Sequence, residues 1–306
     1  MRPIIGTLLR RARRTTLPTP FFLIQRLFIS SHSPARHIKI DDEERQSSDS
    51  SFTRPQSLHI RVLKMILLTF LILLILVLLL AYIIYKPPYL LITFFQWKNP
   101  DVLWHVPLPS SSRVVALTID DAPSDQTAKM LDLLKVFGAK ATFFAIGSQI
   151  AAYPDLLQRM HDEGHEIGNH AWRDEPSISL PPSELERQIK EVESLVPPNS
   201  GSLKYFRPGS GFFNKKMVDR VIGLGYRVVL GSIYPHDPQI HNPARNSKHV
   251  LSMLRPGGII IMHDRRSYSA EQLELILRGM TASEWKAESL GGLLKLADAV
   301  KGKMGG

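Results

Sequence analysis

Hydrophobic residues occur along this chain in two contrasting patterns, one long continuous run and many short ones. The long run extends from Met65 to Tyr85 and reads MILLTFLILLILVLLLAYIIY, 21 residues without a charged side chain. An α-helix of that length rises about 30 Å, which is the thickness of the hydrocarbon core of a bilayer. Buried helices of this length normally keep a polar face, and this run has none. The pattern therefore predicts a single transmembrane helix, a signal anchor.

Beyond residue 110 the apolar runs are short and alternate with segments of helical periodicity. The short runs predict strands, here Arg113–Ile119, Ala139–Ile146, Glu166–Gly168, Tyr205–Arg207, Tyr226–Leu230 and Gly258–Met262. The periodic segments predict helices at Thr127–Phe137, Pro154–Glu163, Ser183–Leu195, Lys215–Leu224, Ala244–Met253 and Gly291–Val300. The third helix is expected to begin with a Ser-x-x-Glu capping box, Ser183 and Glu186. The alternation predicts parallel βαβ units, which place functional groups at the carboxyl ends of the strands.

The net charge of +10 suggests a nucleic-acid or membrane-surface protein until the charges are located. Residues 1–64 hold twelve Lys and Arg against five Asp and Glu, whereas residues 111–306 hold 24 against 22. The nearly balanced C-terminal part argues against a dedicated nucleic-acid binder. The positive-inside rule places residues 1–64 in the cytosol and the C-terminal part on the lumenal or extracellular side. The Arg-rich first 40 residues alternatively resemble an organellar targeting segment.

These patterns divide the chain into four parts. We expect a basic, largely disordered arm at 1–64, the transmembrane helix at 65–85, a juxtamembrane linker at 86–110 and one globular domain at 111–306. Met65 is an alternative start of the chain. With 44% hydrophobic and 22% charged residues, the chain is neither wholly disordered nor a coiled coil. The lack of cysteine excludes disulfides, thiolate metal sites and thiol nucleophiles.

Polar side chains that are costly to bury follow five of the expected strands. In chain order they are Asp120 and Asp121, His170 and Asp174, Arg207, Tyr234 and Asp237, and finally His263 and Asp264. Each has an ordinary explanation, because an Asp can cap a helix, a His and an Asp four residues apart can form a surface pair, and Arg-Pro-Gly can form a turn. Adjacent carboxylates, however, repel each other unless a cation or an arginine holds them. Their occurrence at successive strand ends therefore predicts a shared site.

In this order the residues resemble the polysaccharide deacetylase family, the NodB-homology domain of carbohydrate esterase family four. The resemblance extends from Arg113 to about Ala297. The family motif T-F-D-D reads Thr118-Ile119-Asp120-Asp121, and H-x-x-x-H is matched by His170 with Asp174 in place of the second histidine. R-P-P-Y-G reads Arg207-Pro208-Gly209-Ser210-Gly211, the D-W motif reads Asp237-Pro238, and L-x-x-H-D reads Ile260-Ile261-Met262-His263-Asp264.

The resemblance implies a distorted, incomplete (β/α) barrel behind the transmembrane helix. It also implies metal-dependent hydrolysis of N-acetyl groups on an N-acetylated glycan, such as chitin oligomers, with release of acetate. Asp121, His170 and Asp174 would bind a divalent metal, expected to be Zn²⁺, with Mn²⁺, Co²⁺ or Mg²⁺ as alternatives. A same-fold hydrolase of a non-glycan amide or ester and an inactive glycan-binding relative are the alternative functions.

The resemblance further implies roles for the remaining motif residues. Asp120 would be the general base, Arg207 its ion-pair partner and His263 the general acid. Asp237 or Asp264 would orient His263. The Ser210 N–H would stabilise the oxyanion, and Gly209 and Tyr234 would contribute to the same substrate site.

Departures from the family motifs leave several alternatives. Asp174 gives one nitrogen and two oxygen ligands, which favours tolerance for Mn²⁺ or Mg²⁺. His165 is an alternative ligand, and Arg173 is an alternative ion-pair partner for Asp174 that would support a site without metal. Because Ser210 and Pro238 replace aromatic residues, the rings that contact sugar would come from Phe212, Phe213, Trp172 or Tyr234, each of which is also a plausible core residue.

Overall fold

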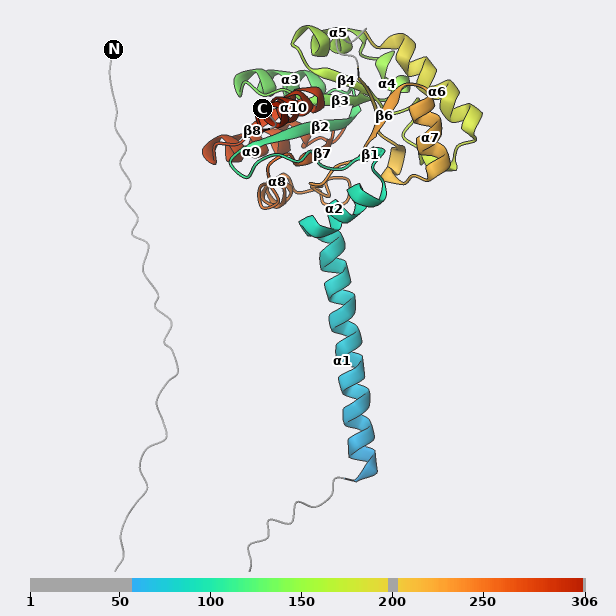
Figure 1. Cartoon of the computed structure of the whole chain (residues 1–306), viewed down its shortest axis with the longest axis vertical. Coiled ribbons are helices and arrows are strands. Elements are labelled where there is room, and N and C mark those ends of the chain that lie inside the picture. The colour runs from blue at the N-terminus through green and yellow to red at the C-terminus, as the bar shows by residue number, and fades with distance from the viewer. Residues whose placement is uncertain (1–56, 198–202, 305–306) are drawn as a thin grey trace, which may run out of the picture. The chain divides into compact units, whose positions relative to one another are not determined.

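A computed structural model describes residues 57–197 and 203–304, so the expected basic arm lies outside the described residues up to residue 56. The strands form one sheet with the order β1-β6-β5-β4-β3-β2-β7 (Figure 1). The strand β8 lies outside this order and pairs with the first residues of β2. Every pairing is parallel. The strands are β1 (Val102–Leu103), β2 (Val114–Ala122), β3 (Thr142–Ala145), β4 (Glu166–Asn169), β5 (Lys204–Phe206), β6 (Tyr226–Val229), β7 (Ile259–His263) and β8 (Lys286–Glu288).

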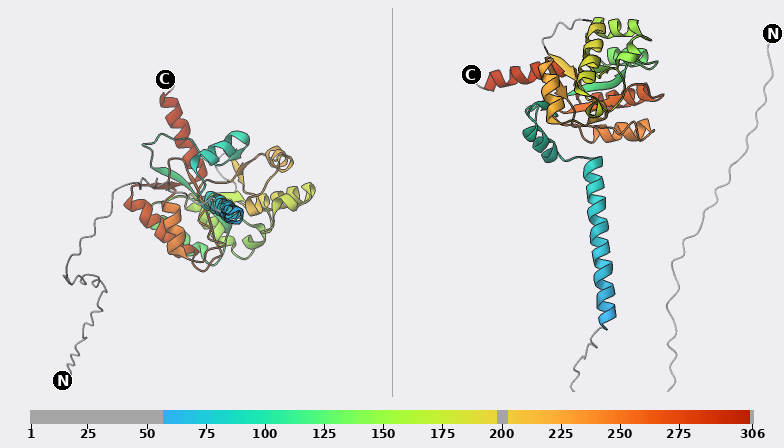
Figure 2. Two further views of the ribbon diagram at one scale, coloured as in Figure 1. Left: turned by 90° about the horizontal axis from the view of Figure 1, so that it is seen from below. Right: turned by 90° about the vertical axis from the view of Figure 1, so that its right-hand side faces the viewer.

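Helices surround this sheet (Figure 2). They are α3 (Thr127–Val136), α4 (Gly147–Ile150), α5 (Pro154–Asp162), α6 (Pro182–Leu195), α7 (Lys215–Gly223), α8 (Pro243–Leu251), α9 (Ser269–Ala282) and α10 (Leu290–Met304). The alternation of strands and helices confirms the predicted parallel βαβ units.

The sheet curls until its two ends approach each other. Beyond β6, Ile233 forms an isolated parallel bridge with Ile260 of β7, and the Ile261 N–H donates to the Ile233 carbonyl oxygen over 2.9 Å. This single bridge stands where a closed barrel would have a full strand pair. The fold is therefore the distorted, incomplete (β/α) barrel that the sequence predicted.

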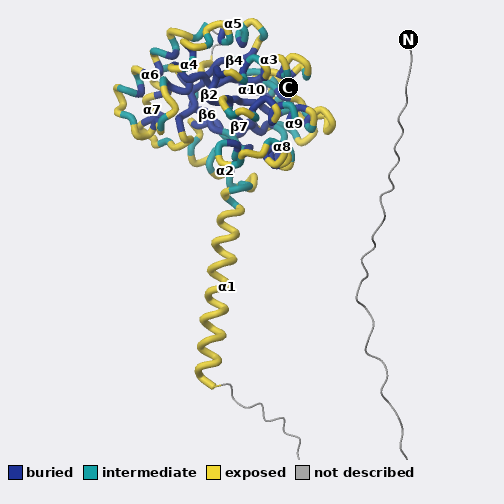
Figure 3. The backbone as a smooth tube through the Cα atoms, turned by 180° about the vertical axis from the view of Figure 1, so that it is seen from behind, coloured by how far each residue is buried: buried dark blue, intermediate teal, exposed yellow. Residues whose placement is uncertain are grey.

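The core lies on both faces of the strands, as burial of a parallel sheet requires (Figure 3). All of β2 except Val114 is buried. One apolar cluster includes Met130 of α3, Phe143 of β3 and Leu273 of α9. Because the strands are held from both sides, the residues at their carboxyl ends are rigidly placed.

The segment 86–110 differs from the expected linker. It contains the helix α2 (Tyr89–Lys98) and the strand β1, whose Val102 and Leu103 are buried and pair with β6. Val106 is also buried, and its N–H donates to the Gly257 carbonyl oxygen over 2.9 Å. The sheet therefore extends to the N-terminal side of the expected boundary at residue 111, because it includes residues 102–103.

The apolar run forms the helix α1 (Leu58–Tyr85), which begins seven residues before the predicted Met65. None of its side chains is buried against the described chain, and its mean hydropathy reaches 3.3. By length and composition it is one helix that could cross a membrane. At its C-terminal end the Tyr85 ring stacks on His236 with a centroid distance of 4.9 Å.

The predicted capping box is wrong. The N-cap residue of α6 is Pro181, and no side chain caps this helix. Glu186 instead contacts Lys190 over 2.7 Å and Arg220 over 3.0 Å. With Pro181 as N-cap and Pro182 as its first residue, the helix starts two residues earlier than a box with Ser183 as N-cap requires, because proline is preorganised for a first helical turn.

Candidate active site

The carboxyl ends of the strands surround a pocket of about 470 Å³. The sequence-predicted residues that line it are Asp120, Asp121, His170, Asp174, Arg207, Ser210, Tyr234 and His263. They come from the ends of β2, β4, β5 and β7 and from the loop after β6. The five motifs that are far apart in the sequence therefore meet in one cavity.

Asp120 and Arg207 form a buried ion pair in the lining of this pocket. Arg207 Nη1 lies 2.6 Å from Asp120 Oδ1 and 2.7 Å from Thr118 Oγ1, and Nη2 donates to the Leu230 carbonyl oxygen over 2.9 Å. The guanidinium also stacks 4.1 Å from the centroid of the Phe144 ring. Burial lowers the pKa of Arg207, and the charge and hydrogen bond of Asp120 oppose that effect. Arg207 thus neutralises Asp120 and fixes its orientation.

His170 is held in one tautomer. Its Nδ1 lies 2.7 Å from the carbonyl oxygen of Arg207, which can only accept, so Nδ1 carries the proton. In the neutral ring this leaves the lone pair on Nε2, which lies 3.7 Å from Asp121 Oδ1. A metal-binding histidine commonly donates its other N–H to a carbonyl oxygen in this way. The geometry presents a free nitrogen lone pair beside a carboxylate.

Asp121, His170 and Asp174 each offer a ligand atom, and these atoms lie within 4.8 Å of one another. Burial raises the pKa of Asp121, and the charges of Asp174 and Asp120 add to this effect. A cation between the three groups would favour the charged carboxylates and accept the Nε2 lone pair. Two carboxylates and one neutral imidazole are a donor set that suits Zn²⁺ and harder divalent ions. The residues present therefore fit a divalent metal.

Two arginines that the sequence analysis did not assign face the same carboxylates. Arg265 Nη1 lies 3.7 Å from Asp174 Oδ2, and Arg266 Nη2 lies 4.0 Å from Asp121 Oδ2. The predicted alternative partner of Asp174 was Arg173, so the structure corrects this partner to Arg265. The sequence signal was the pair of arginines directly after the His-Asp motif.

His263, the last residue of β7, forms two hydrogen bonds with Asp237. The Asp237 carboxylate accepts from the His263 backbone N–H over 2.8 Å and lies 2.9 Å from its Nδ1. Burial disfavours the charged imidazole, but the hydrogen bond and charge of Asp237 outweigh it, with help from Asp120 and Asp121. The pKa of His263 is therefore raised to about 9. His263 is protonated near neutral pH, as a general acid must be.

Of the two carboxylates expected to orient His263, Asp237 does so and Asp264 does not. Asp264 accepts from Ser124 Oγ over 2.6 Å, from Thr127 Oγ1 and from the Arg265 N–H over 2.8 Å. These contacts tie the end of β7 to the loop that begins α3. Asp264 is thus a structural residue of the loop.

Several site residues adopt left-handed backbone conformations. Asp121 has a φ of 64°, Ser210 of 59°, His236 of 61° and Arg265 of 66°. Each non-glycine residue in this region costs about 1–3 kcal/mol, and such residues concentrate where function constrains the backbone. The backbone at these four residues is therefore strained, as is common at functional sites.

The predicted oxyanion residues fall into two groups. Ser210 and Tyr234 line the pocket, and burial raises the pKa of Tyr234 to about 12, so that it stays neutral. Gly209 is buried and its N–H donates to Ser177 Oγ over 2.9 Å. Gly209 is therefore not among the described residues that line the pocket, and its N–H is already engaged.

The structure also places the aromatic residues expected to contact sugar and the alternative metal ligand His165. Trp172 packs against the core, Phe213 packs beside Trp104, and Phe212 is exposed outside the pocket lining. Trp104, which the sequence analysis placed in the linker, lines the pocket together with Tyr234. His165 accepts the Ala141 N–H through Nδ1 over 3.2 Å and is structural.

Comparison with known proteins identifies the family of this chain. Residues 108–229 match the sequence profile described as polysaccharide deacetylase. The chain is 30% identical over 200 residues to a peptidoglycan-N-acetylglucosamine deacetylase of Bacillus cereus, a match that covers 63% of this chain and 93% of that protein. The chain belongs to the polysaccharide deacetylase family.

The match covers very different shares of two other relatives. The peptidoglycan-N-acetylglucosamine deacetylase PgdA of Listeria monocytogenes is 33% identical over 178 residues, which are 56% of this chain but only 37% of that protein. The solved structure of the peptidoglycan deacetylase PdaC from Bacillus subtilis has a TM-score of 0.59 and 28% identity, and it covers 64% of this chain and 97% of that one. The shared part is thus the family domain itself.

Proposed function

We propose that this protein is a metal-dependent deacetylase that hydrolyses the N-acetyl groups of an N-acetylated glycan and releases acetate. The observation that carries the proposal is the convergence in one pocket of a candidate metal-binding triad, a buried carboxylate–arginine pair and a protonated histidine. The named relatives act on N-acetylglucosamine or N-acetylmuramic acid of peptidoglycan. We therefore expect a polymer of N-acetylated amino sugars, with peptidoglycan and chitin oligomers as the two substrates to compare.

Asp121, His170 and Asp174 would hold the divalent metal, with Zn²⁺ as the expected ion. A bound divalent ion supplies Lewis acidity toward the acetamide carbonyl and an attacking water. The Arg207 carbonyl oxygen keeps His170 Nε2 free for this role. The second oxygen ligand in place of a nitrogen should allow Mn²⁺ or Mg²⁺ to substitute.

The remaining residues would move the protons. Asp120 takes a proton from the attacking water, and its ion pair with Arg207 keeps the carboxylate in place. His263 donates a proton to the leaving amine, and Asp237 orients its ring through Nδ1. The Ser210 backbone N–H would donate to the developing oxyanion, and Tyr234 and Trp104 would contact the sugar ring.

We further propose that α1 anchors the enzyme in a membrane as a single span. Its 28 residues rise about 42 Å, which is enough for a hydrocarbon core of about 30 Å. Basic residues before the helix favour a cytosolic N-terminus and a catalytic domain on the lumenal or extracellular side.

The test is acetate release by the full chain in detergent from chitin oligomers, from peptidoglycan and from a non-glycan acetyl ester. Chelation should abolish release, and readdition of Zn²⁺ or Mn²⁺ should restore it. Asp120→Asn should retain the metal and lose about 10²- to 10⁴-fold in rate. Asp219→Asn, an exposed carboxylate on α7, is the matched control.

Each failure has its own meaning. Bound metal with acetate released only from the ester would favour the alternative hydrolase. A folded protein that binds no metal would favour an inactive relative in which Arg265 and Arg266 neutralise the carboxylates. Wild-type turnover in Asp120→Asn would remove the assigned base.

A further inference from the structure

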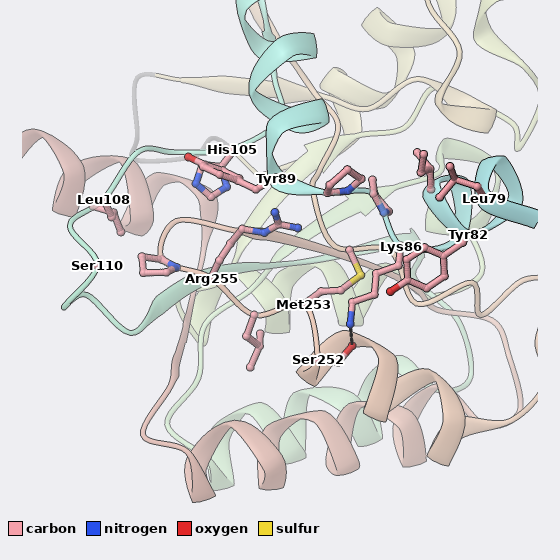
Figure 4. A pocket seen from close by; sticks show the side chains of 15 residues that line it. Leu79, Tyr82, Lys86, Tyr89, His105, Leu108, Ser110, Ser252, Met253 and Arg255 are labelled. Carbon is pink, nitrogen blue, oxygen red and sulfur yellow. Dashed lines mark hydrogen bonds between the residues drawn. The ribbon is translucent and has the colours of Figure 1, made fainter. Parts of the chain in front are cut away.

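A second cavity, of about 670 Å³, lies at the C-terminal end of α1 and shares no lining residue with the candidate active site (Figure 4). Its walls come from the last turns of α1, from the turn at 86–89, from residues 105–110 and from the segment 252–256 between α8 and β7. It therefore opens where the apolar helix meets the globular domain.

Two cations line this cavity. Lys86 donates to Ser252 Oγ over 2.9 Å (Figure 4), and Arg255 Nη2 lies 3.4 Å from the Ser232 carbonyl oxygen. None of the fifteen described residues that line the cavity is acidic, and among the described residues neither cation forms an ion pair. The Arg255 Nε is buried without a hydrogen-bond partner. A partly buried arginine without a counter-charge indicates a place for an anion.

The ring of Tyr89 contacts Arg255. Its guanidinium lies 5.3 Å from the centroid of the Tyr89 ring, and the Tyr89 ring lies edge-on to His105 at 5.0 Å. His105 is buried, and its Nδ1 has no hydrogen-bond partner among the described residues. Burial lowers the pKa of His105 to about 4, so this ring stays neutral and adds no charge to that of the two cations.

The opposite wall is apolar and continues the surface of α1. Leu79, Tyr82 and Ile83 contribute to it, together with Met253 and Leu254 of the domain. Tyr82 and Tyr85 mark the end of the helix where aromatic side chains favour the membrane interface. A ligand that matches both walls needs an anionic head and an apolar tail.

We propose that this cavity binds an anionic phospholipid, with its phosphate between Lys86 and Arg255 and an acyl chain along Leu79 and Ile83. The inference rests on the proposed membrane span of α1 and is independent of the deacetylase activity. The lipid would tie the catalytic domain to the membrane surface at a fixed place. Its phosphate supplies the counter-charge that the chain itself does not provide.

The test compares phosphatidylglycerol with phosphatidylcholine on the full chain in a neutral detergent, by native mass spectrometry and by the shift in melting temperature. Phosphatidylglycerol should bind more tightly and raise the melting temperature further. Arg255→Gln and Lys86→Gln should each lower phosphatidylglycerol affinity about fivefold and reduce the preference for phosphatidylglycerol over phosphatidylcholine. Arg255→Lys should retain most of the affinity, because it keeps the charge.

The matched control is Lys98→Gln, an exposed lysine at the end of α2 that does not line the cavity. Its phosphatidylglycerol affinity should change by less than about twofold. The proposal is overturned if Arg255→Gln and Lys86→Gln bind phosphatidylglycerol like this control. It is also overturned if inorganic phosphate alone gives the full shift in melting temperature. The same holds if the lipid-free protein is a dimer and the cavity variants dissociate it, because the cavity would then be an interface between two copies of the chain.

Flotation with phosphatidylglycerol vesicles separates this inference from the proposed span. A chain that stays soluble without detergent and does not float contradicts the membrane span. A chain that floats but shows no preference between the two lipids contradicts the cavity assignment alone.

Discussion

The Nδ1 of His170 donates a hydrogen bond to the backbone carbonyl oxygen of Arg207 over 2.7 Å. This contact joins the candidate metal ligands to the candidate base, since the Arg207 side chain holds Asp120. One residue thus sets the tautomer of a candidate ligand through its backbone and positions the candidate base through its side chain.

The first prediction concerns metal binding. His170→Ala should lower the affinity for Zn²⁺ by more than about 100-fold, because even the loss of a partner of a metal ligand costs 10- to 100-fold. Elemental analysis after dialysis measures the bound metal. His241→Ala, an exposed histidine outside the pocket lining, should keep its metal content. Equal metal content in both variants would contradict the assigned site.

The second prediction concerns pH. His263 must be protonated to act as an acid, so kcat/KM should fall as the pH rises through its pKa of about 9. Asp237→Asn removes the main partner that raises this pKa, so activity should be lost at a lower pH than in the wild type. The measurement is the pH profile of kcat/KM. An alkaline limb that does not move would exclude His263 as the acid.

The parallel strands and their polar ends could be predicted from the sequence because both depend on local patterns. Short apolar runs specify buried parallel strands, and such strands place their carboxyl ends at one edge. Asp121 and His170 therefore meet although 49 residues separate them. The helix α9 was missed in the sequence analysis, although Leu273, Ile276, Leu277 and Met280 have helical spacing.

Other features depend on tertiary contacts and could not be predicted. The strand β1 has two residues, and only its pairing with β6 makes it a strand. Trp104 reaches the pocket because this pairing brings its segment to the domain. The choice of Asp237 over Asp264 as the partner of His263 likewise depends on where the loop after β6 folds back.

The third prediction tests whether the segment before residue 111 belongs to the domain. A Cβ at Gly257 would lie 1.6 Å from the Val106 carbonyl oxygen, and the φ of Gly257 is +75°. Gly257→Ala should therefore destabilise the domain by more than the roughly 1–2 kcal/mol of left-handed strain alone. Gly225→Ala, with a φ of +82° and no atom within 4 Å, carries only that strain. Equal free energies of unfolding in the two variants would show that residues 102–106 do not pack on the domain.

The last prediction concerns competition between Arg265 and the metal for Asp174. Arg265 Nη1 lies 3.7 Å from the Asp174 carboxylate, and both side chains are partly exposed. A cation bound by Asp174 is repelled by this guanidinium, so Arg265→Gln should strengthen metal binding by up to about fivefold, the upper range for an exposed ion pair. Arg173→Gln makes the same charge change one residue before Asp174 but removes no ion pair with it, and it should alter the affinity less. Competition titration with a chromogenic chelator measures both constants. If Arg265→Gln instead weakened metal binding, Arg265 would support the ligand and not compete for it.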